Sequence, residues 1–137
     1  ACRKVGWKVF GMAAMPSLRP VKPNVLPKPV ALVTSIYQLS ASFPSEERFG
    51  LTAQIRRAAV SVPSNIAEGQ ARHTTKEFIH FISTAEGSLA EVDTQLVIAI
   101  ELGFCKATDA QATFDSIAEL RKMLNSLRRK LSLVTCH

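Results

Sequence analysis

The sequence of 137 residues contains few of the residue patterns that mark an enzyme or a membrane protein. Its three histidines and three cysteines have no metal-ligand spacing, and neither a glycine-rich phosphate loop nor a nucleophile motif is present. The longest apolar run, residues 96–102, contains Glu101 and is far shorter than the roughly 18 residues of a membrane span. We therefore expect a non-enzymatic protein with no metal, no cofactor and no membrane segment.

Cysteine is scarce, and the number of cysteines is odd. Cys2, Cys105 and Cys136 form an odd set, with two of the three near the ends of the sequence. A disulfide framework uses pairs of cysteines, so this set predicts free thiols in a reducing cytoplasm. Cys105 is expected to pack as a small hydrophobic residue.

Proline is concentrated in one short segment. Five of the seven prolines lie within residues 16–29, at positions 16, 20, 23, 27 and 29. Each proline fixes its backbone and removes an amide donor, so this segment favours an extended conformation over a helix. Residues 1–29 are therefore predicted to form a Pro-rich basic arm, extended or disordered, and residues 30–134 a folded domain.

The positive charge of the chain belongs to that arm. The formal net charge is +6, and residues 1–30 contain six lysines and arginines and no acidic residue. The remaining residues hold 11 basic and 11 acidic side chains. The folded domain would therefore attract nucleic acid only through a local patch that the fold creates.

Residues 30–134 show the apolar spacing of helices and no strand pattern. Steps of three and four separate the apolar residues in each of four segments, and these helices are predicted over residues 30–42, 46–70, 74–103 and 108–131. The connections are short, which makes consecutive helices antiparallel neighbours. The expected fold is an all-α, antiparallel up-down four-helix bundle. A hydrophobic content of 47% also favours an apolar surface between subunits.

Local signals predict where these helices begin and end. Thr74 and Glu77 form a capping box, in which each side chain satisfies the other residue's unpaired amide. A second capping box is predicted at Thr108–Gln111, and a left-handed C-cap at Gly103. Ser45 is a predicted N-cap, and Glu46 and Glu47 after it complement the helix dipole.

Pro63 lies inside the apolar stripe of the helix predicted over residues 46–70. It removes one amide donor and crowds the carbonyl of Ala59, at a local cost of about 3 kcal/mol. We therefore expect a kinked helix that is held by tertiary packing. Three polar residues after Pro63, namely Ser64, Asn65 and Glu68, are expected to satisfy nearby backbone groups. Gly69 is expected to close the helix and completes this structural motif. A binding pocket is the alternative for these residues.

The same region resembles a known bacterial family. The matching motifs are Phe43-Pro44, Arg56-Arg57-Ala58-Ala59, Val62-Pro63-Ser64-Asn65-Ile66-Ala67-Glu68-Gly69, Thr75-Lys76-Glu77-Phe78, Gly87-Ser88-Leu89 and Leu102-Gly103. Over about residues 30–131 the sequence is similar to the four-helix-bundle proteins encoded in intervening sequences of large-subunit ribosomal RNA genes. The accessory variability protein of diversity-generating retroelements is a relative of that family. The resemblance implies a homopentamer of bundles without enzyme activity, and the family's Trp-containing first turn is replaced here by residues 25–29.

The resemblance also implies a nucleic-acid partner. The retroelement protein binds a reverse transcriptase and nucleic acid through a basic surface, which corresponds here to Arg48, Arg56, Arg57, Arg72 and Lys76. Guanidinium groups suit phosphate oxygens, and repetition around a ring adds avidity. We therefore predict a non-enzymatic oligomeric bundle that binds RNA or DNA, or that accompanies a ribonucleoprotein.

Two alternatives stay open at this point. Arg56 and Arg57 can instead form ion pairs within or between subunits, with acidic residues such as Glu47, Glu68 or Glu91. The ring can also be a protein–protein scaffold that binds a polypeptide partner and no nucleic acid.

Three further patterns have structural explanations. Glu77 and His80 have the Glu-x-x-His spacing of di-iron bundles, but the sequence holds no second copy of it. Gly87 is costly inside a helix, which favours a close helix approach or a subunit contact there. The Arg128–Lys130 cluster is expected to be a solvated helix end, with an RNA contact as its alternative.

Overall fold

A computed structural model describes residues 25–135, and this part of the chain is entirely helical. It contains four α-helices and one 3-10 helix, in the order α2 (Pro27–Ser40), η2 (Ser45–Phe49), α3 (Leu51–Gln70), α4 (Thr75–Glu101) and α5 (Ala107–Thr135). No strand occurs within residues 25–135, so the all-α prediction with four helices is confirmed there. The prediction of an arm over residues 1–24 lies outside the described residues.

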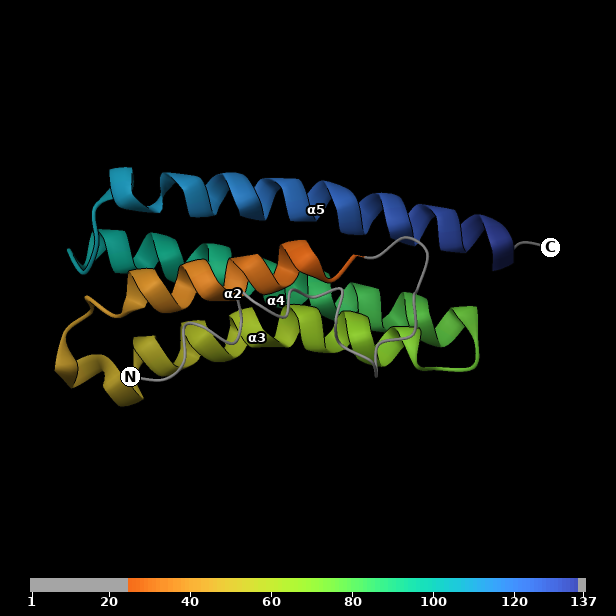
Figure 1. Cartoon of the computed structure of the whole chain (residues 1–137), viewed down its shortest axis with the longest axis horizontal. Coiled ribbons are helices and arrows are strands. Elements are labelled where there is room, and N and C mark those ends of the chain that lie inside the picture. Colours follow the sequence, from red (N-terminus) through yellow and green to blue (C-terminus); the bar gives the residue numbers. More distant parts are fainter. Residues whose placement is uncertain (1–24, 136–137) are drawn as a thin grey trace, which may run out of the picture.

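The four α-helices lie side by side along the length of the molecule (Figure 1). In that view η2 and the α4–α5 turn lie at the left-hand end, and the α3–α4 turn lies at the right-hand end. Each helix contributes one buried stripe, and the largest fully buried side chains are Leu32, Ile36, Ile55, Ile66, Ile82, Leu89, Leu96, Ile117, Leu120 and Leu124. Burying each such side chain contributes about 1.5–3 kcal/mol, so this core supplies the main stabilising term.

The first helix begins earlier than predicted. It starts at Pro27 rather than at residue 30, and Val25 and Leu26 are already buried in the core. Prolines are tolerated there because the first amides of a helix have no intrahelical acceptor, so Pro27 and Pro29 forfeit no hydrogen bond. The ammonium group of Lys28 also forms an ion pair with Glu119 of α5. Residues 25–29, predicted as part of the arm, therefore belong to the bundle.

The segment predicted as one helix over residues 46–70 is divided at Gly50. The 3-10 helix η2 precedes this glycine and α3 follows it. Ser45 is not an N-cap, since it is the first residue of η2 and Pro44 occupies the cap position without a side-chain hydrogen bond. Glu47 takes over the capping role, because its Oε2 atom accepts a hydrogen bond of 2.9 Å from the amide of Leu51. A carboxylate at this position also complements the α3 dipole.

The predicted capping box at the start of α4 is confirmed. The amide of Glu77 donates to Thr74 Oγ1 at 3.2 Å, and the amide of Thr74 donates to Glu77 Oε2 at 3.2 Å. The hydrogen bond from the Thr74 side chain lowers the pKa of the Glu77 carboxyl below its ordinary value. This box fixes the turn between α3 and α4.

Gly103 forms the predicted left-handed C-cap, with φ of +74°. The amide of Phe104 donates to the carbonyl of Ala99 at 2.8 Å, and that of Gly103 donates to Ile100 at 2.9 Å. These two bonds make a Schellman motif. Phe104 then packs against Phe43, with ring centroids 5.9 Å apart, which joins this turn to the turn that follows α2.

The prediction of a second capping box at Thr108–Gln111 is wrong. Helix α5 begins at Ala107, so Thr108 lies inside the first turn instead of capping it. The amide of Ala110 donates to the carbonyl of Lys106, and the Gln111 side chain donates to Asp115 at 3.1 Å rather than reaching back. The Schellman motif sets the direction of the chain so early that the helix starts before the threonine.

Two glycines in the bundle have opposite surroundings. A Cβ atom built on Gly69 would lie 2.7 Å from Phe78 Cδ2 and 2.7 Å from Phe81 Cβ, so only a glycine lets α3 and α4 meet here. A Cβ atom built on Gly87 would meet no described atom within 4 Å. A close helix approach therefore does not explain Gly87 within one described chain, and a subunit contact stays a prediction.

These surroundings predict opposite effects of alanine. Gly69→Ala is expected to lower the free energy of unfolding by about 1–3 kcal/mol, since Phe81 Cβ is fixed to the α4 backbone and cannot move aside. Gly87→Ala is the matched control and should raise it by about 1 kcal/mol through helix propensity. Urea unfolding followed by circular dichroism measures both, and equal effects would contradict the close approach at Gly69.

Candidate functional site

Arg56 fastens the end of α2 to α3. Its Nε atom donates to Ser40 Oγ at 2.8 Å, and Nη2 donates to the carbonyl of Tyr37 at 3.5 Å. The guanidinium carbon also lies 4.5 Å from the centre of the Tyr37 ring. A cation beside the last carbonyls of α2 is favourable for its dipole. Two of the five N–H donors of Arg56 are thus engaged within the bundle.

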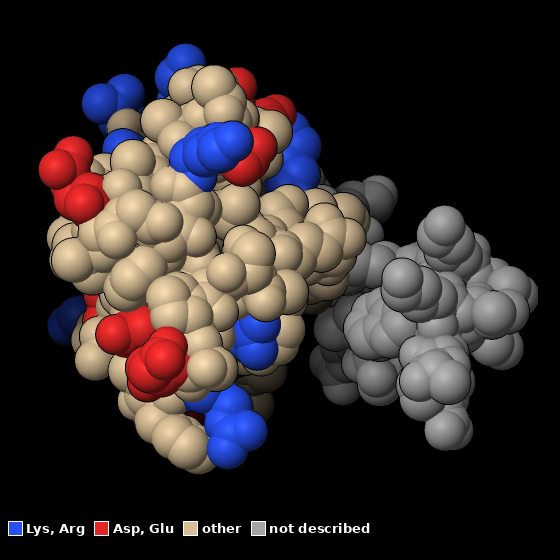
Figure 2. Space-filling view, turned by 90° about the vertical axis from the view of Figure 1, so that its left-hand side faces the viewer, with Lys and Arg blue, Asp and Glu red and all other residues tan. Residues whose placement is uncertain are grey.

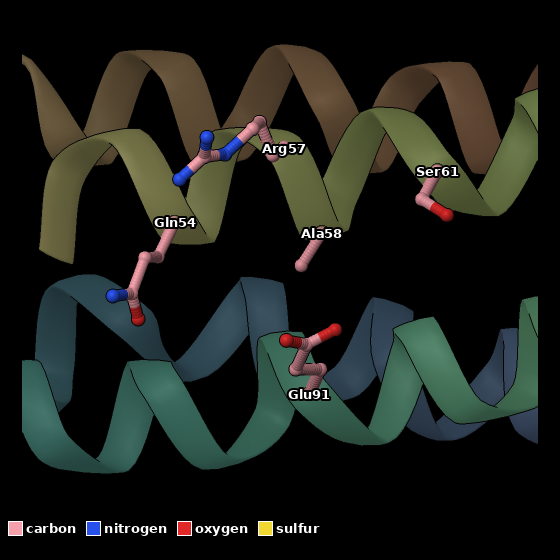
Figure 3. A pocket seen from close by; sticks show the side chains of 5 residues that line it. All are labelled: Gln54, Arg57, Ala58, Ser61 and Glu91. Atoms are coloured by element: carbon pink, nitrogen blue, oxygen red, sulfur yellow. The ribbon is translucent and has the colours of Figure 1, made fainter.

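Arg57 is exposed, and no hydrogen bond or ion pair links it to another residue within 25–135. It borders a groove of about 210 Å³ between α3 and α4, which is also lined by Gln54, Ala58, Ser61 and Glu91. Figure 3 shows the Glu91 carboxylate pointing from α4 toward α3, whereas the guanidinium of Arg57 lies over α3 and not beside that carboxylate. Among the described residues, Arg57 therefore has no ion-pair partner.

A second groove lies on the other side of Arg57. Its volume is about 610 Å³, and its lining joins α2 to α3 through Tyr37, Ala53, Arg56, Arg57, Val60 and Ser61. Tyr37 and Val60 are 44% and 41% exposed, although both are large hydrophobic residues. This second groove is mainly apolar apart from its two arginines, which is typical of a surface that contacts another protein.

The other three predicted basic residues lie at the two ends of the bundle. Arg48 belongs to η2, where its guanidinium stacks 4.8 Å over the Phe49 ring. Arg72 lies at the α3–α4 turn, paired with Glu68 at 2.7 Å and 5.0 Å from the centre of the Phe81 ring. Lys76 is exposed and pairs with no acidic residue within the described chain.

The structure does not bring the five basic residues together. Helix α3 separates η2 from the α3–α4 turn, and its 20 residues span about 30 Å. The five residues are therefore spread over the length of the bundle, with Arg56 and Arg57 in the first half of α3. Of these five, only Arg72 forms an ion pair with an acidic residue of the described chain.

Polar residues after Pro63 serve the backbone of α3. Ser64 Oγ donates to the carbonyl of Val60 at 2.8 Å, and Asn65 Nδ2 donates to the carbonyl and the hydroxyl of Ser61 at 2.8 Å each. Helix α3 is continuous through Pro63, and its kink stays a prediction. These side chains thus act on the carbonyls that directly follow Ala59.

Sequence reasoning missed a hydroxyl pair in the α3–α4 seam. Ser61 Oγ and Ser88 Oγ lie 2.9 Å apart, and Ser88 also donates to the carbonyl of Thr84 at 3.2 Å. Ser88 is 8% exposed, so this is a nearly buried polar contact between the two helices. The signal for it in the sequence is a serine, a small polar residue, on each of the two helices.

The described residues hold no group of three or more histidine, cysteine, aspartate or glutamate side chains suited to a metal ion. Glu77 is used by the capping box, and His80 packs edge-on against Phe81 with ring centroids 5.7 Å apart. Cys105 is a free thiol packed against the core, and burial raises its pKa. Within the same residues, no helix is long and apolar enough to cross a membrane.

The described residues define a small all-α protein with four α-helices. The family model of the 23S rRNA-intervening sequence proteins matches residues 22–126, and the chain therefore belongs to that family. The match begins ahead of Val25 and covers the whole of α2, α3 and α4. No curated protein matched the chain.

The two adjacent arginines are expected to differ in their effects on stability. Arg56→Ala should lower the free energy of unfolding by about 1–2 kcal/mol, because it leaves the nearly buried Ser40 hydroxyl without its donor. Arg57→Ala should change it by less than about 0.5 kcal/mol, as is usual for an exposed surface position. Thermal and urea unfolding measure both variants, and a large loss with Arg57→Ala would assign that residue a structural role.

Proposed function

We propose that the protein is a non-enzymatic accessory factor that assembles into a homo-oligomer and binds structured RNA or DNA. The observation that carries the proposal is the exposed guanidinium of Arg57, which forms no hydrogen bond or ion pair with another residue of 25–135 and lies between two grooves on the surface of α3. The family is named for ribosomal RNA intervening sequences, which supports RNA as the first ligand to examine.

The contacts of the basic residues rank them for this role. Arg57 and Lys76 have no competing acidic partner among the described residues, so each can meet a phosphate without breaking an ion pair. Arg48 is next, since it is stacked on an exposed phenylalanine. Arg72 is already paired with Glu68, and Arg56 already donates to Ser40, so each has fewer N–H groups left for a nucleic acid.

Assembly into an oligomer would strengthen the binding of nucleic acid by this weakly cationic surface. Residues 25–135 contain 12 basic and 11 acidic side chains, a balance too even for strong attraction by one copy. Repeating these basic residues around a ring of up-down bundles would multiply the number of simultaneous phosphate contacts. We propose a pentamer, as the resemblance to the intervening-sequence and retroelement proteins implies, in the reducing cytoplasm of a bacterium.

The apolar groove beside Arg57 favours a second candidate function. Tyr37 and Val60 expose large hydrophobic side chains on its two walls, and such surfaces mark contacts between proteins. The same groove would join subunits in the first proposal and would hold a polypeptide partner in the second. In the second proposal the protein is a scaffold that binds no nucleic acid.

The dependence of binding on salt separates the two functions. Fluorescence anisotropy of the full chain with a structured RNA and a duplex DNA is expected to show binding that weakens steeply as salt increases. Arg57→Glu and Lys76→Glu should each reduce the affinity. Each should also lower the slope of log affinity against log salt concentration by about one, which corresponds to the loss of one phosphate contact. Lys122→Glu, at an exposed site on α5, is the charge-matched control and should have a smaller effect.

The basic arm needs its own control in this experiment. Replacing Arg3, Lys4, Lys8, Arg19 and Lys22 by glutamine removes the arm's charges and leaves the Lys28–Glu119 ion pair intact. Deleting residues 1–29 would instead remove Val25 and Leu26 from the core. Binding that survives the glutamine variant but not Arg57→Glu supports the proposal. Binding that depends on the arm alone, or no binding at all, would contradict it.

A further inference from the structure

The bundle end formed by η2 and the α4–α5 turn exposes several large hydrophobic side chains. Phe49 is 84% exposed, Leu102 is 57% exposed and Ile98 is 42% exposed. Figure 2 shows this end of the molecule, with a broad uncharged area and with acidic and basic side chains mostly around it. Exposed apolar area of this kind marks an interaction site.

The three hydrophobic residues continue the α3–α4 seam. Ile98 lies seven residues after Glu91 and therefore on the same face of α4, and Glu91 borders the groove against α3. Leu102 lies one turn further on, and its amide donates to the carbonyl of Ile98 at 2.9 Å. Phe49 directly precedes Gly50 and α3. The register set by Ser61 beside Ser88, and by Gly69 beside Phe78 and Phe81, places the first turn of α3 opposite Ile98. We call Phe49, Ile98 and Leu102 the apolar end patch.

The charge near the apolar end patch is negative. Residues 43–50 and 98–110 contain Glu46, Glu47, Glu101 and Asp109 against Arg48 and Lys106, a net charge of −2. The rest of residues 25–135 carries +3. None of these four carboxylates forms an ion pair with a cation of the described chain. The end of the bundle is therefore both apolar and acidic, and it suits a segment that is apolar and basic.

The chain itself contains such a segment. Residues 3–10 combine three cations and no acid with four hydrophobic side chains, namely Arg3, Lys4 and Lys8 with Val5, Trp7, Val9 and Phe10. Opposite charges at this density favour the encounter, and the aromatic side chains supply apolar area.

The connection is long enough for contact within one copy. Fourteen residues separate Phe10 from Val25, and at about 3.1 Å per residue an extended, proline-containing chain spans about 43 Å. The 14 residues of α2, which lead from this point toward η2, extend over only about 21 Å. The length therefore allows residues 3–10 to reach the apolar end patch of the same molecule.

We propose that residues 3–10 dock in the same molecule onto the apolar end patch, with Trp7 and Phe10 against Phe49 and Leu102, and with the basic side chains toward Glu46 and Glu101. Docking covers the exposed hydrophobic surface and neutralises the acidic end. It also holds the arm's cations on the bundle, so that a polyanion must compete with the acidic end for them. The docking itself does not depend on the proposed nucleic-acid function.

Trp7 reports directly on this contact, because it is the single tryptophan of the sequence. In the full chain at low micromolar concentration, its emission is expected to be blue-shifted and protected from acrylamide. Phe49→Ser combined with Leu102→Ser should shift the emission to the red and raise the quenching constant at least twofold. Leu133→Ser combined with Val134→Ser, at the exposed apolar residues near the end of α5, is the control and should change neither quantity.

A second pair of substitutions tests the charges independently. Glu46→Lys combined with Glu101→Lys should also expose Trp7, and high salt should weaken the protection in the parent protein. Both residues are exposed, and a circular dichroism spectrum equal to that of the parent shows that each variant is folded. Equal acrylamide quenching of Trp7 in the parent, in the Phe49/Leu102 double variant and in the Glu46/Glu101 double variant would overturn the proposal. Protection that increases with protein concentration would overturn docking within one molecule.

Discussion

The close approach of α3 and α4 is the constraint on which the rest of the structure depends. Gly69 leaves room for Phe78 and Phe81 at one end of the seam, and Ser61 and Ser88 join their hydroxyls at 2.9 Å near its middle. Helices that pack this closely fix the residues on both rims of their contact. The same seam therefore sets the place of Arg57, of the groove beside Glu91 and of the apolar end patch.

Much of the fold follows from the sequence, because its strongest signals are local. The apolar stripes, the Thr74–Glu77 capping box and the left-handed Gly103 each depend on a few neighbouring residues, and all three occur as expected. The errors arise where a distant contact decides between two local solutions. Prolines 27 and 29 lie in a helix because the first turn needs no amide acceptors, and because Val25 and Leu26 are buried in the core.

The candidate site was less predictable than the fold. A motif shows which cations are present but not which are already engaged, and Arg56 and Arg57 illustrate the difference. Adjacent helical residues differ in direction by about 100°. Arg56 therefore lies against Tyr37 and Ser40, whereas Arg57 faces solvent between two grooves. The acidic character of the end formed by η2 and the α4–α5 turn was equally hidden. Glu46 and Asp109 lie more than 60 residues apart in the sequence, and the fold brings their elements to the same end of the bundle (Figure 1).

The central claim is that many copies of a weakly cationic bundle act together, so the mass of the protein in solution tests it most directly. One chain has a mass of 15.0 kDa. Light scattering coupled to gel filtration at micromolar concentration is expected to give a multiple of this mass, five copies in the proposed ring. A stable species of one chain would contradict the proposal, because the 12 basic and 11 acidic side chains of residues 25–135 are too evenly balanced for one copy to attract a polyanion strongly.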